Sequence, residues 1–185
     1  MNVLGLDLSY SSTGVCYPDG VTGRIRIPSV PTRKTNPRYE HDKCDRIRTI
    51  CDKIDAICST YGVDLVVLEG FSFNSKTGRE EAGGLGFGVR VELAKAGMPW
   101  LAVPPASVKK YATGKGNADK IAVAYAVVQR FGDWAPQQSD EIDAFVIWHM
   151  AMDADGRPLV ELPKTHRSAL KAVEWPLPAA GMAGL

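Results

Sequence analysis

Residues 2–8 read NVLGLDL, an apolar run that holds a single carboxylate, Asp7. A short apolar run of this kind, bounded by turn-forming residues, is typical of a buried strand, and the segment SYSSTG that follows it is such a turn. A charged group in a buried strand needs a partner. The run therefore predicts the first strand of a central sheet and places a candidate functional residue within it.

The remainder of the chain alternates short apolar runs with amphipathic segments. Further strands are predicted over residues 15–17, 23–27, 64–69 and 100–103, and helices over residues 39–61, 89–96, 106–111, 118–131 and 139–152. Ser139 is the expected N-cap of the last helix. The glycine-rich stretch 70–88 is predicted to be a mobile loop or a loose helix start. Three strands followed by alternating helices and strands predict an α/β fold, a mixed sheet with helices on its faces.

Length and composition limit the class of protein. The 185 residues, 45% of them hydrophobic, suit one domain, which we expect over residues 1–154, followed by a poorly ordered, Pro-containing tail over 155–185. The length excludes large two-lobed enzymes, and the net charge of +1 excludes a histone-like coat of positive charge. No apolar run is long enough to cross a membrane, and the N-terminus lacks the basic region of a signal peptide. Four cysteines without a CxxC pair indicate reduced thiols, so a cytoplasmic location is expected.

Three further carboxylates lie at the end of a predicted strand or in the first turns of a predicted helix. Glu69 ends the predicted strand 64–69, and Asp140 and Asp143 are three residues apart on one face of the last helix. If these acids and Asp7 converge, their mutual repulsion requires cations among them, and oxygen ligands suit divalent metals. Two such ions in a carboxylate cluster support phosphodiester cleavage. Taken singly, Asp140 also fits a helix first-turn acid, and Asp7 also fits a partner for turn amides.

A basic block, KKYATGKGNADK, covers residues 109–120. Its glycines allow a close approach of the backbone to a phosphate, and it leads into a helix N-terminus, which favours anions. An ordinary solvated turn is the alternative interpretation. Candidate phosphate contacts are Lys109, Lys110, Lys115 and Lys120. A second basic stretch could extend a DNA-binding face or be a solvated hairpin and linker; it contains Arg24, Arg26, Arg33, Lys34 and Arg38.

The blocks GLDLSYSSTGV, VVLEGF, VPPASVKKYATGKGNADK and SDEIDAFVIWHMA together resemble the RuvC-type Holliday junction resolvases of the RNase H-like superfamily, over about residues 1–152. The resemblance implies a five-stranded mixed sheet flanked by helices. It also implies a metal-dependent nuclease of DNA recombination and repair, with two Mg²⁺ or Mn²⁺ ions per site. Such enzymes bind branched DNA as homodimers, and each subunit nicks one of two opposed strands of a four-way junction.

The resemblance also assigns roles to single residues. Asp7, Glu69, Asp140 and Asp143 match the metal-binding catalytic carboxylates, and Lys109 and Lys120 match lysines that support DNA binding and catalysis. The family has an aromatic wedge just past the matching glutamate; here Phe71 and Phe73 flank the aligned Ser72, so the identity of the wedge stays open. Plausible backbone contacts from the same region are Lys76, Arg79 and Arg90. His149, in the last helix, is interpreted as a core residue or one that lies behind the site.

Two other functions compete with junction resolution. The segment LDLSYSSTG also resembles the first phosphate loop of ATP-binding proteins of the actin and sugar-kinase type. The length of the chain and the acids of the last helix argue against that interpretation. The closer rival is a nuclease that acts mainly on flaps or replication forks, and the residues alone do not separate it from a strict four-way junction resolvase.

Overall fold

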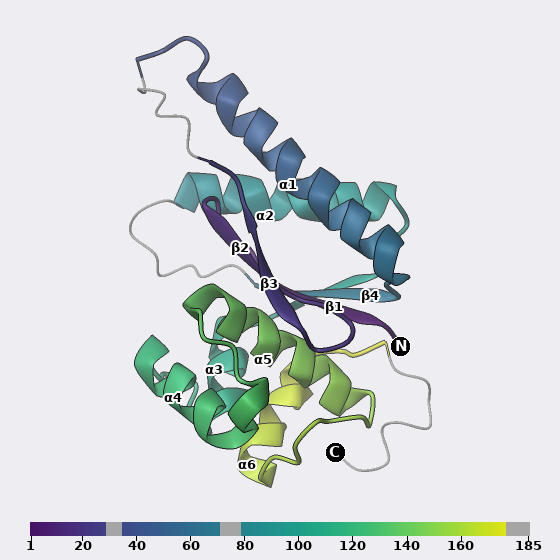
Figure 1. Ribbon diagram of the computed structural model, residues 1–185, viewed down its shortest axis with the longest axis vertical. Coiled ribbons are helices and arrows are strands. Elements are labelled where there is room, and N and C mark those ends of the chain that lie inside the picture. Colours follow the sequence, from purple (N-terminus) through teal and green to yellow (C-terminus); the bar gives the residue numbers. More distant parts are fainter. Residues whose placement is uncertain (29–34, 71–78, 177–185) are drawn as a thin grey trace.

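A five-stranded mixed sheet forms the centre of the protein (Figure 1). The computed structural model describes residues 1–28, 35–70 and 79–176. The strand order is β3-β2-β1-β4-β5, with β1 parallel to β4, β4 parallel to β5, and β2 antiparallel to both of its neighbours. The predicted mixed sheet is therefore confirmed. The strands are β1 (Val3–Asp7), β2 (Ser12–Cys16), β3 (Thr22–Arg26), β4 (Leu65–Glu69) and β5 (Trp100–Val103).

The helices lie in two layers, with α1 and α2 on one face of the sheet and α3 to α6 on the other (Figure 1). The alternation of side chains along β1 fits these layers, because Leu4 and Leu6 pack with α1 and α2 while Val3 packs with α5. No helix in the described residues is long and apolar enough to span a membrane. The bounds are α1 (Tyr39–Tyr61), α2 (Arg79–Lys95), α3 (Pro105–Thr113), α4 (Lys120–Phe131), η1 (Gly132–Trp134), α5 (Ser139–Ala154), α6 (Lys164–Arg167) and η2 (Ser168–Ala172).

The start of α2 and the N-cap of α5 both bear on the prediction. Of the two alternatives for the stretch 70–88, a loop or a helix start, the helix start holds for residues 79–88, because α2 begins at Arg79. Its glycines lower the helix propensity, but Leu85 and Val89 are buried against the sheet and hold the segment there. The last helix, α5, begins at Ser139, so its N-cap is Gln138, whose side chain makes no capping hydrogen bond.

Among the described glycines, those of β1 and β2 that face α5 have the tightest surroundings. A Cβ atom at Gly5 would lie 2.5 Å from the Ala144 carbonyl oxygen, closer than real Cβ contacts allow. A Cβ at Gly14 would overlap the Asp140 carbonyl group. Glycine at both positions therefore lets the backbone of α5 lie directly on the two strands.

The C-terminal segment differs from the predicted tail. Residues 155–176 include α6 and η2, and Leu162, Ala169 and Leu170 are buried in the core beside α3 and α5. The segment is also held by charge, because Arg167 Nε donates to the buried carboxylate of Asp153 at 3.1 Å. The prolines in this part of the sequence suggested disorder, but the apolar residues between them complete the core. The rest of the predicted tail, residues 177–185, lies outside the described residues.

The interpretation of His149 as a core residue is confirmed. Its side chain is fully buried, and its Nε2 accepts a hydrogen bond from the Leu159 amide at 3.1 Å. The Nδ1 atom lies 2.8 Å from the Tyr111 hydroxyl, which donates in turn to Asp153 at 2.8 Å. Burial lowers the pKa of His149 to about 4. The neutral ring therefore joins α3, α5 and the C-terminal segment.

The glycine contact leads to a stability prediction. Replacing Gly14 with Ala should cost about 3 kcal/mol or more, because the new Cβ meets helix backbone, which cannot move aside as a side chain can. Gly83 is the matched control, since a Cβ there meets nothing within 4 Å. Gly83→Ala should raise the stability by about 0.5–1 kcal/mol, because it removes a glycine from the interior of a helix. Urea unfolding measures both, and a wild-type midpoint for Gly14→Ala would contradict the packing argument.

Candidate active site

Asp7 and Glu69 lie side by side at the carboxyl ends of two parallel strands. In the β1–β4 ladder Leu6 pairs with Leu68, and the next residue on each strand is the acid. Neighbouring strands are about 4.8 Å apart, so the two carboxylates share one edge of the sheet. Both side chains are on the face covered by α5, because residues two apart on a strand point the same way and Val3 and Val67 pack on that side.

The first turns of α5 bring Asp140 and Asp143 to the same edge. Asp7 is paired with Gly14 in the β1–β2 ladder, and the carbonyl of Asp140 rests against Gly14. The backbone of Asp140 therefore lies over the strand position next to Asp7. Asp143 is one helical turn further along, on the same face of α5. This packing places the backbone positions of the four acids at one edge of the sheet.

The carboxylates strongly affect each other's ionisation. Burial and the charges of Asp143 and Asp140 raise the pKa of Asp7 to about 7, against the opposing effect of Lys120. Burial, Asp7 and Asp143 likewise raise the pKa of Glu69 to about 7. Burial also raises the pKa of Asp143. Carboxylates that resist ionisation at neutral pH are under electrostatic strain, which cations placed among them would relieve.

Two lysines from the basic block face this cluster. Lys120, the first residue of α4, has its Nζ 3.7 Å from Asp143 Oδ2, and its side chain is 76% exposed. Lys109, on α3, is half-buried and lowers the pKa values of Glu69 and Asp143. The turn between the two helices is fixed by Asp119, which accepts a hydrogen bond from the Ala122 amide at 2.8 Å. Both lysines are thus held beside the acids.

The other predicted contacts have different outcomes. Lys110 is half-buried on α3, and Lys115 is exposed in the turn that follows. Arg90 does not fit a DNA contact, because it is 8% exposed, donates to the Gly86 carbonyl and lies over the Trp100 ring. Four of the predicted DNA contacts lie outside the described residues and side chains, namely Phe71, Phe73, Lys76 and the side chain of Arg79.

The donor set at this edge suits a hard divalent cation. All four acids offer carboxylate oxygens, the ligands that Mg²⁺ and Mn²⁺ prefer. In the described ranges, no three His, Cys, Asp or Glu side chains are close enough to form a ready-made metal-binding group. One of the four carboxylates, that of Asp143, is paired with Lys120. The acids therefore fit a metal site in chemistry and placement, with side-chain rotations left to complete it.

One acid of this region was undervalued from the sequence. The sequence alone makes Glu141, between the two aspartates, an acid of the helix first turn, where the helix dipole favours it. In the structure its carboxylate accepts a hydrogen bond from Thr22 and pairs with Arg24, both on β3. The partners are more than a hundred residues away in the chain, so no local signal could reveal them.

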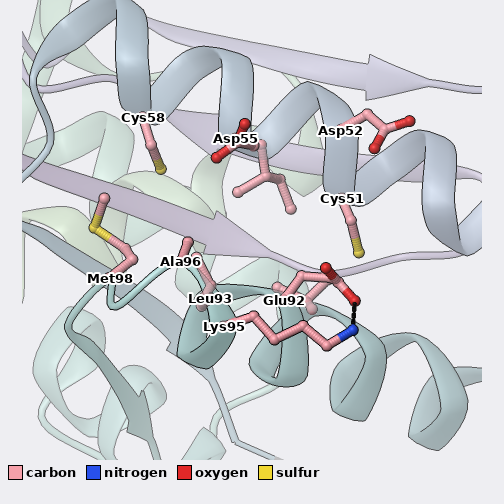
Figure 2. Close-up of a pocket in the computed structure, with 11 residues that line it drawn as sticks. Cys51, Asp52, Asp55, Cys58, Glu92, Leu93, Lys95, Ala96 and Met98 are labelled. Atoms are coloured by element: carbon pink, nitrogen blue, oxygen red, sulfur yellow. Dashed lines mark hydrogen bonds and ion pairs between the residues drawn. The ribbon is translucent and has the colours of Figure 1, made fainter.

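A groove lies on the opposite face of the sheet from the four carboxylates of the candidate site. The groove, of about 310 Å³, runs between α1 and α2, with Cys51, Cys58 and Met98 among its lining residues (Figure 2). These helices cover the opposite face of the sheet from α5. Burial raises the pKa values of Cys51 and Cys58 to about 11, so both thiols stay protonated at neutral pH. The groove is therefore no part of the carboxylate site.

Comparisons with known proteins agree with this arrangement. No family model matches the chain. The chain is 30% identical over 152 residues to the crossover junction endodeoxyribonuclease RuvC of Parafrankia sp., covering 80% of this chain and 83% of the relative. It is 31% identical over 153 residues to the RuvC protein of Frankia alni, covering 80% of this chain and 75% of the relative.

Solved structures show the same fold. Thermus thermophilus RuvC superposes with a TM-score of 0.58 at 24% sequence identity, covering 86% of this chain and all of that one. A structure of Thermus thermophilus RuvC in complex with a Holliday junction substrate superposes with a TM-score of 0.54 at 23% identity. The identity to curated relatives over most of both chains, together with the shared fold, shows that this chain belongs to the RuvC family of crossover junction endodeoxyribonucleases.

Proposed function

We propose that the chain is a metal-dependent endonuclease that resolves four-way DNA junctions by paired nicks. The observation that carries the proposal is the meeting of four acids from β1, β4 and α5 at one sheet edge, with Lys120 3.7 Å from Asp143. Membership in the RuvC family supports the choice of substrate. A cluster of buried carboxylates and flanking lysines suits a phosphodiester, since the lysines attract the phosphate that the acids alone would repel.

The residues of the site divide the work between metal and DNA. Asp7, Glu69, Asp140 and Asp143 hold two Mg²⁺ or Mn²⁺ ions. When bound, such ions activate a water molecule and stabilise the leaving oxygen. Lys120 faces the phosphate from the solvent side and balances the charge of Asp143. Lys109 opposes the rise in the pKa values of Glu69 and Asp143 and so favours the ionised forms that bind a metal.

The DNA path follows the basic block. Branched DNA reaches the acids along α3 and the turn before α4, where the lysines attract successive phosphates. The residues that follow β4 supply an aromatic wedge and further backbone contacts, as the family resemblance implies. We assign these contacts to Lys109, Lys110, Lys115, Lys120, Phe71, Phe73, Lys76 and Arg79.

The functional unit is a homodimer built on α2. Paired nicks need two active sites at a fixed separation, and a closed two-fold interface provides this. Phe87 and Val91, one turn apart on α2, are 63% and 48% exposed. An exposed apolar helix face of this kind favours a second copy of the chain. The four cysteines are free, which suits work in the reducing cytoplasm.

Removal of one carboxylate tests the chemistry. Asp7→Asn should reduce the cleavage rate by more than about 100-fold, beyond the usual effect of a residue that only orients a metal ligand. Junction binding in metal-free buffer should be unchanged or tighter, because one repulsive charge is lost. The assay compares labelled four-way, three-way, flap and linear DNA with Mg²⁺ or Mn²⁺. Wild-type cleavage by Asp7→Asn would reject the site, and a wild-type preference for flaps or forks would redirect the substrate.

Salt dependence tests the DNA path. The logarithm of the DNA-binding constant falls linearly with the logarithm of the salt concentration. Lys109→Ala and Lys120→Ala should each make this slope less steep by about one, because one phosphate contact is lost. Lys53→Ala is the control, since Lys53 is exposed on α1, on the other face of the sheet. Equal slopes for all four proteins would place the DNA elsewhere.

A charge on α2 tests the dimer. Val91→Glu should leave the monomer folded, because Val91 is 48% exposed, and weaken dimerisation by at least about tenfold through burial of an unpaired charge. Val128→Glu, at a position of 50% exposure on α4, is the matched control and should stay dimeric. Sedimentation measures both, and junction cleavage by Val91→Glu should yield single nicks. A Val91→Glu dimer as tight as the wild type would exclude this interface.

A further inference from the structure

The first turn of α5 has no side-chain cap, a feature that it shares with α1, α3 and α6 but not with α4. Asp119 caps α4 with its side chain, whereas Gln138 makes no capping hydrogen bond to α5. Unsatisfied amide groups at a helix start leave its first turn prone to fraying. This turn carries Asp140 and leads directly to Asp143. A contact with another element of the fold must therefore hold the two aspartates in place.

Glu141 provides such a connection to the edge of the sheet. Its Oε1 lies 3.0 Å from Arg24 Nε, and its Oε2 accepts a hydrogen bond from Thr22 Oγ1 at 3.0 Å. The Glu141 and Arg24 side chains are only 14% and 23% exposed. A charge-assisted pair that is largely shielded from water is stronger than an exposed surface pair. Arg24 also donates to the Gln138 side chain at 3.3 Å, so it reaches the residue before the helix as well.

The geometry explains why this link controls rotation of the helix. Thr22 and Arg24 are two apart on β3 and so point to the same side of the sheet, toward α5. Glu141 is about 100° around the helix from Asp140, so its side chain pulls sideways, away from the metal-binding face. On the other side, the Asp140 carbonyl rests on Gly14. The contact of the Asp140 carbonyl with Gly14 sets the distance of the first turn from the sheet. The contacts of Glu141 with Arg24 and Thr22 set the rotation of this turn about the helix axis.

We propose that Glu141, held by Arg24 and Thr22 of β3, is a positioning residue that sets the placement of Asp140 and Asp143 for metal binding. The proposal deepens the proposed function, since it rests on these two aspartates as metal ligands. The Glu141 carboxylate contacts Arg24 and Thr22, so it acts on the metal site through Asp140 and Asp143. Its carboxylate acts by tying an uncapped helix start to the edge strand.

The direct test is binding of Mn²⁺ to the metal-free protein by calorimetric titration, without DNA. Glu141→Ala should weaken Mn²⁺ binding by about 10-fold to 100-fold, the usual loss when a residue that orients a metal ligand is removed. Glu141→Gln keeps a hydrogen-bond acceptor for Thr22 and should fall between wild type and Glu141→Ala. Asp45→Ala removes the exposed pair with Arg48 on α1 and should bind Mn²⁺ as the wild type does.

A double-mutant cycle separates positioning from general loss of stability. Arg24→Met should weaken Mn²⁺ binding in the same way, and the double variant should be no weaker than Glu141→Ala, because both changes break one link. Binding of junction DNA in metal-free buffer should stay within about twofold in Glu141→Ala and Glu141→Gln, because the Glu141 carboxylate contacts Arg24 and Thr22 in the protein interior. If Glu141→Ala fails to fold, Thr22→Val and Glu141→Gln carry the same comparison.

Each outcome separates this inference from the proposed function. Wild-type Mn²⁺ affinity in Glu141→Ala, or additive losses in the double variant, would overturn the role of Glu141 even if the wild type cleaves junctions. A Glu141-dependent Mn²⁺ affinity in a protein that cleaves no branched DNA would retain the positioning role and reject the substrate.

Discussion

The direct contact of α5 with Gly5 and Gly14 is the constraint on which the site depends. A helix usually packs on a sheet through side chains, which keep the two backbones well apart. Here a Cβ at Gly5 would be 2.5 Å from a helix carbonyl, so the helix lies on the strands themselves. This close approach puts Asp140 over the strand position beside Asp7. The parallel pairing of β1 and β4 then adds Glu69. Three elements from distant parts of the chain thus deliver their acids to one edge.

The same packing creates an electrostatic problem that the protein meets only in part. Burial and neighbouring charge raise the pKa values of Asp7 and Glu69 to about 7, against ordinary values of 3.8 and 4.5. Ionisation of these groups therefore costs folding energy as the pH rises from about 4 through 7, and the metal-free protein should be less stable at pH 8 than at pH 5. Lys120 and Lys109 offset some of this cost. Divalent cations would remove the rest, so stability and metal affinity are linked through the same carboxylates.

Much of this arrangement was predictable from the sequence because its signals are local. Short apolar runs ending in Asp7 and Glu69 indicated the two strands, and the spacing of Asp140 and Asp143 placed both on one helix face. The errors arose where tertiary contacts override local preference. Glycines left the start of α2 undecided between a loop and a helix, and burial of Leu85 against the sheet decides for the helix. Prolines hid the C-terminal segment, which Leu170 and Arg167 fasten to the core. Glu141 has partners on an edge strand, and such pairs leave no spacing pattern.

Proton release on metal binding tests the central claim most directly. If Asp7 and Glu69 titrate near pH 7 because they share one buried site with Asp143, binding of Mn²⁺ at pH 7 should release about one proton per chain in total, and close to none at pH 9. Calorimetric titration in two buffers with different ionisation enthalpies counts these protons. Asp7→Asn should lower the number released at pH 7. Mn²⁺ binding without proton release at pH 7 would show that the carboxylates are not brought together as described.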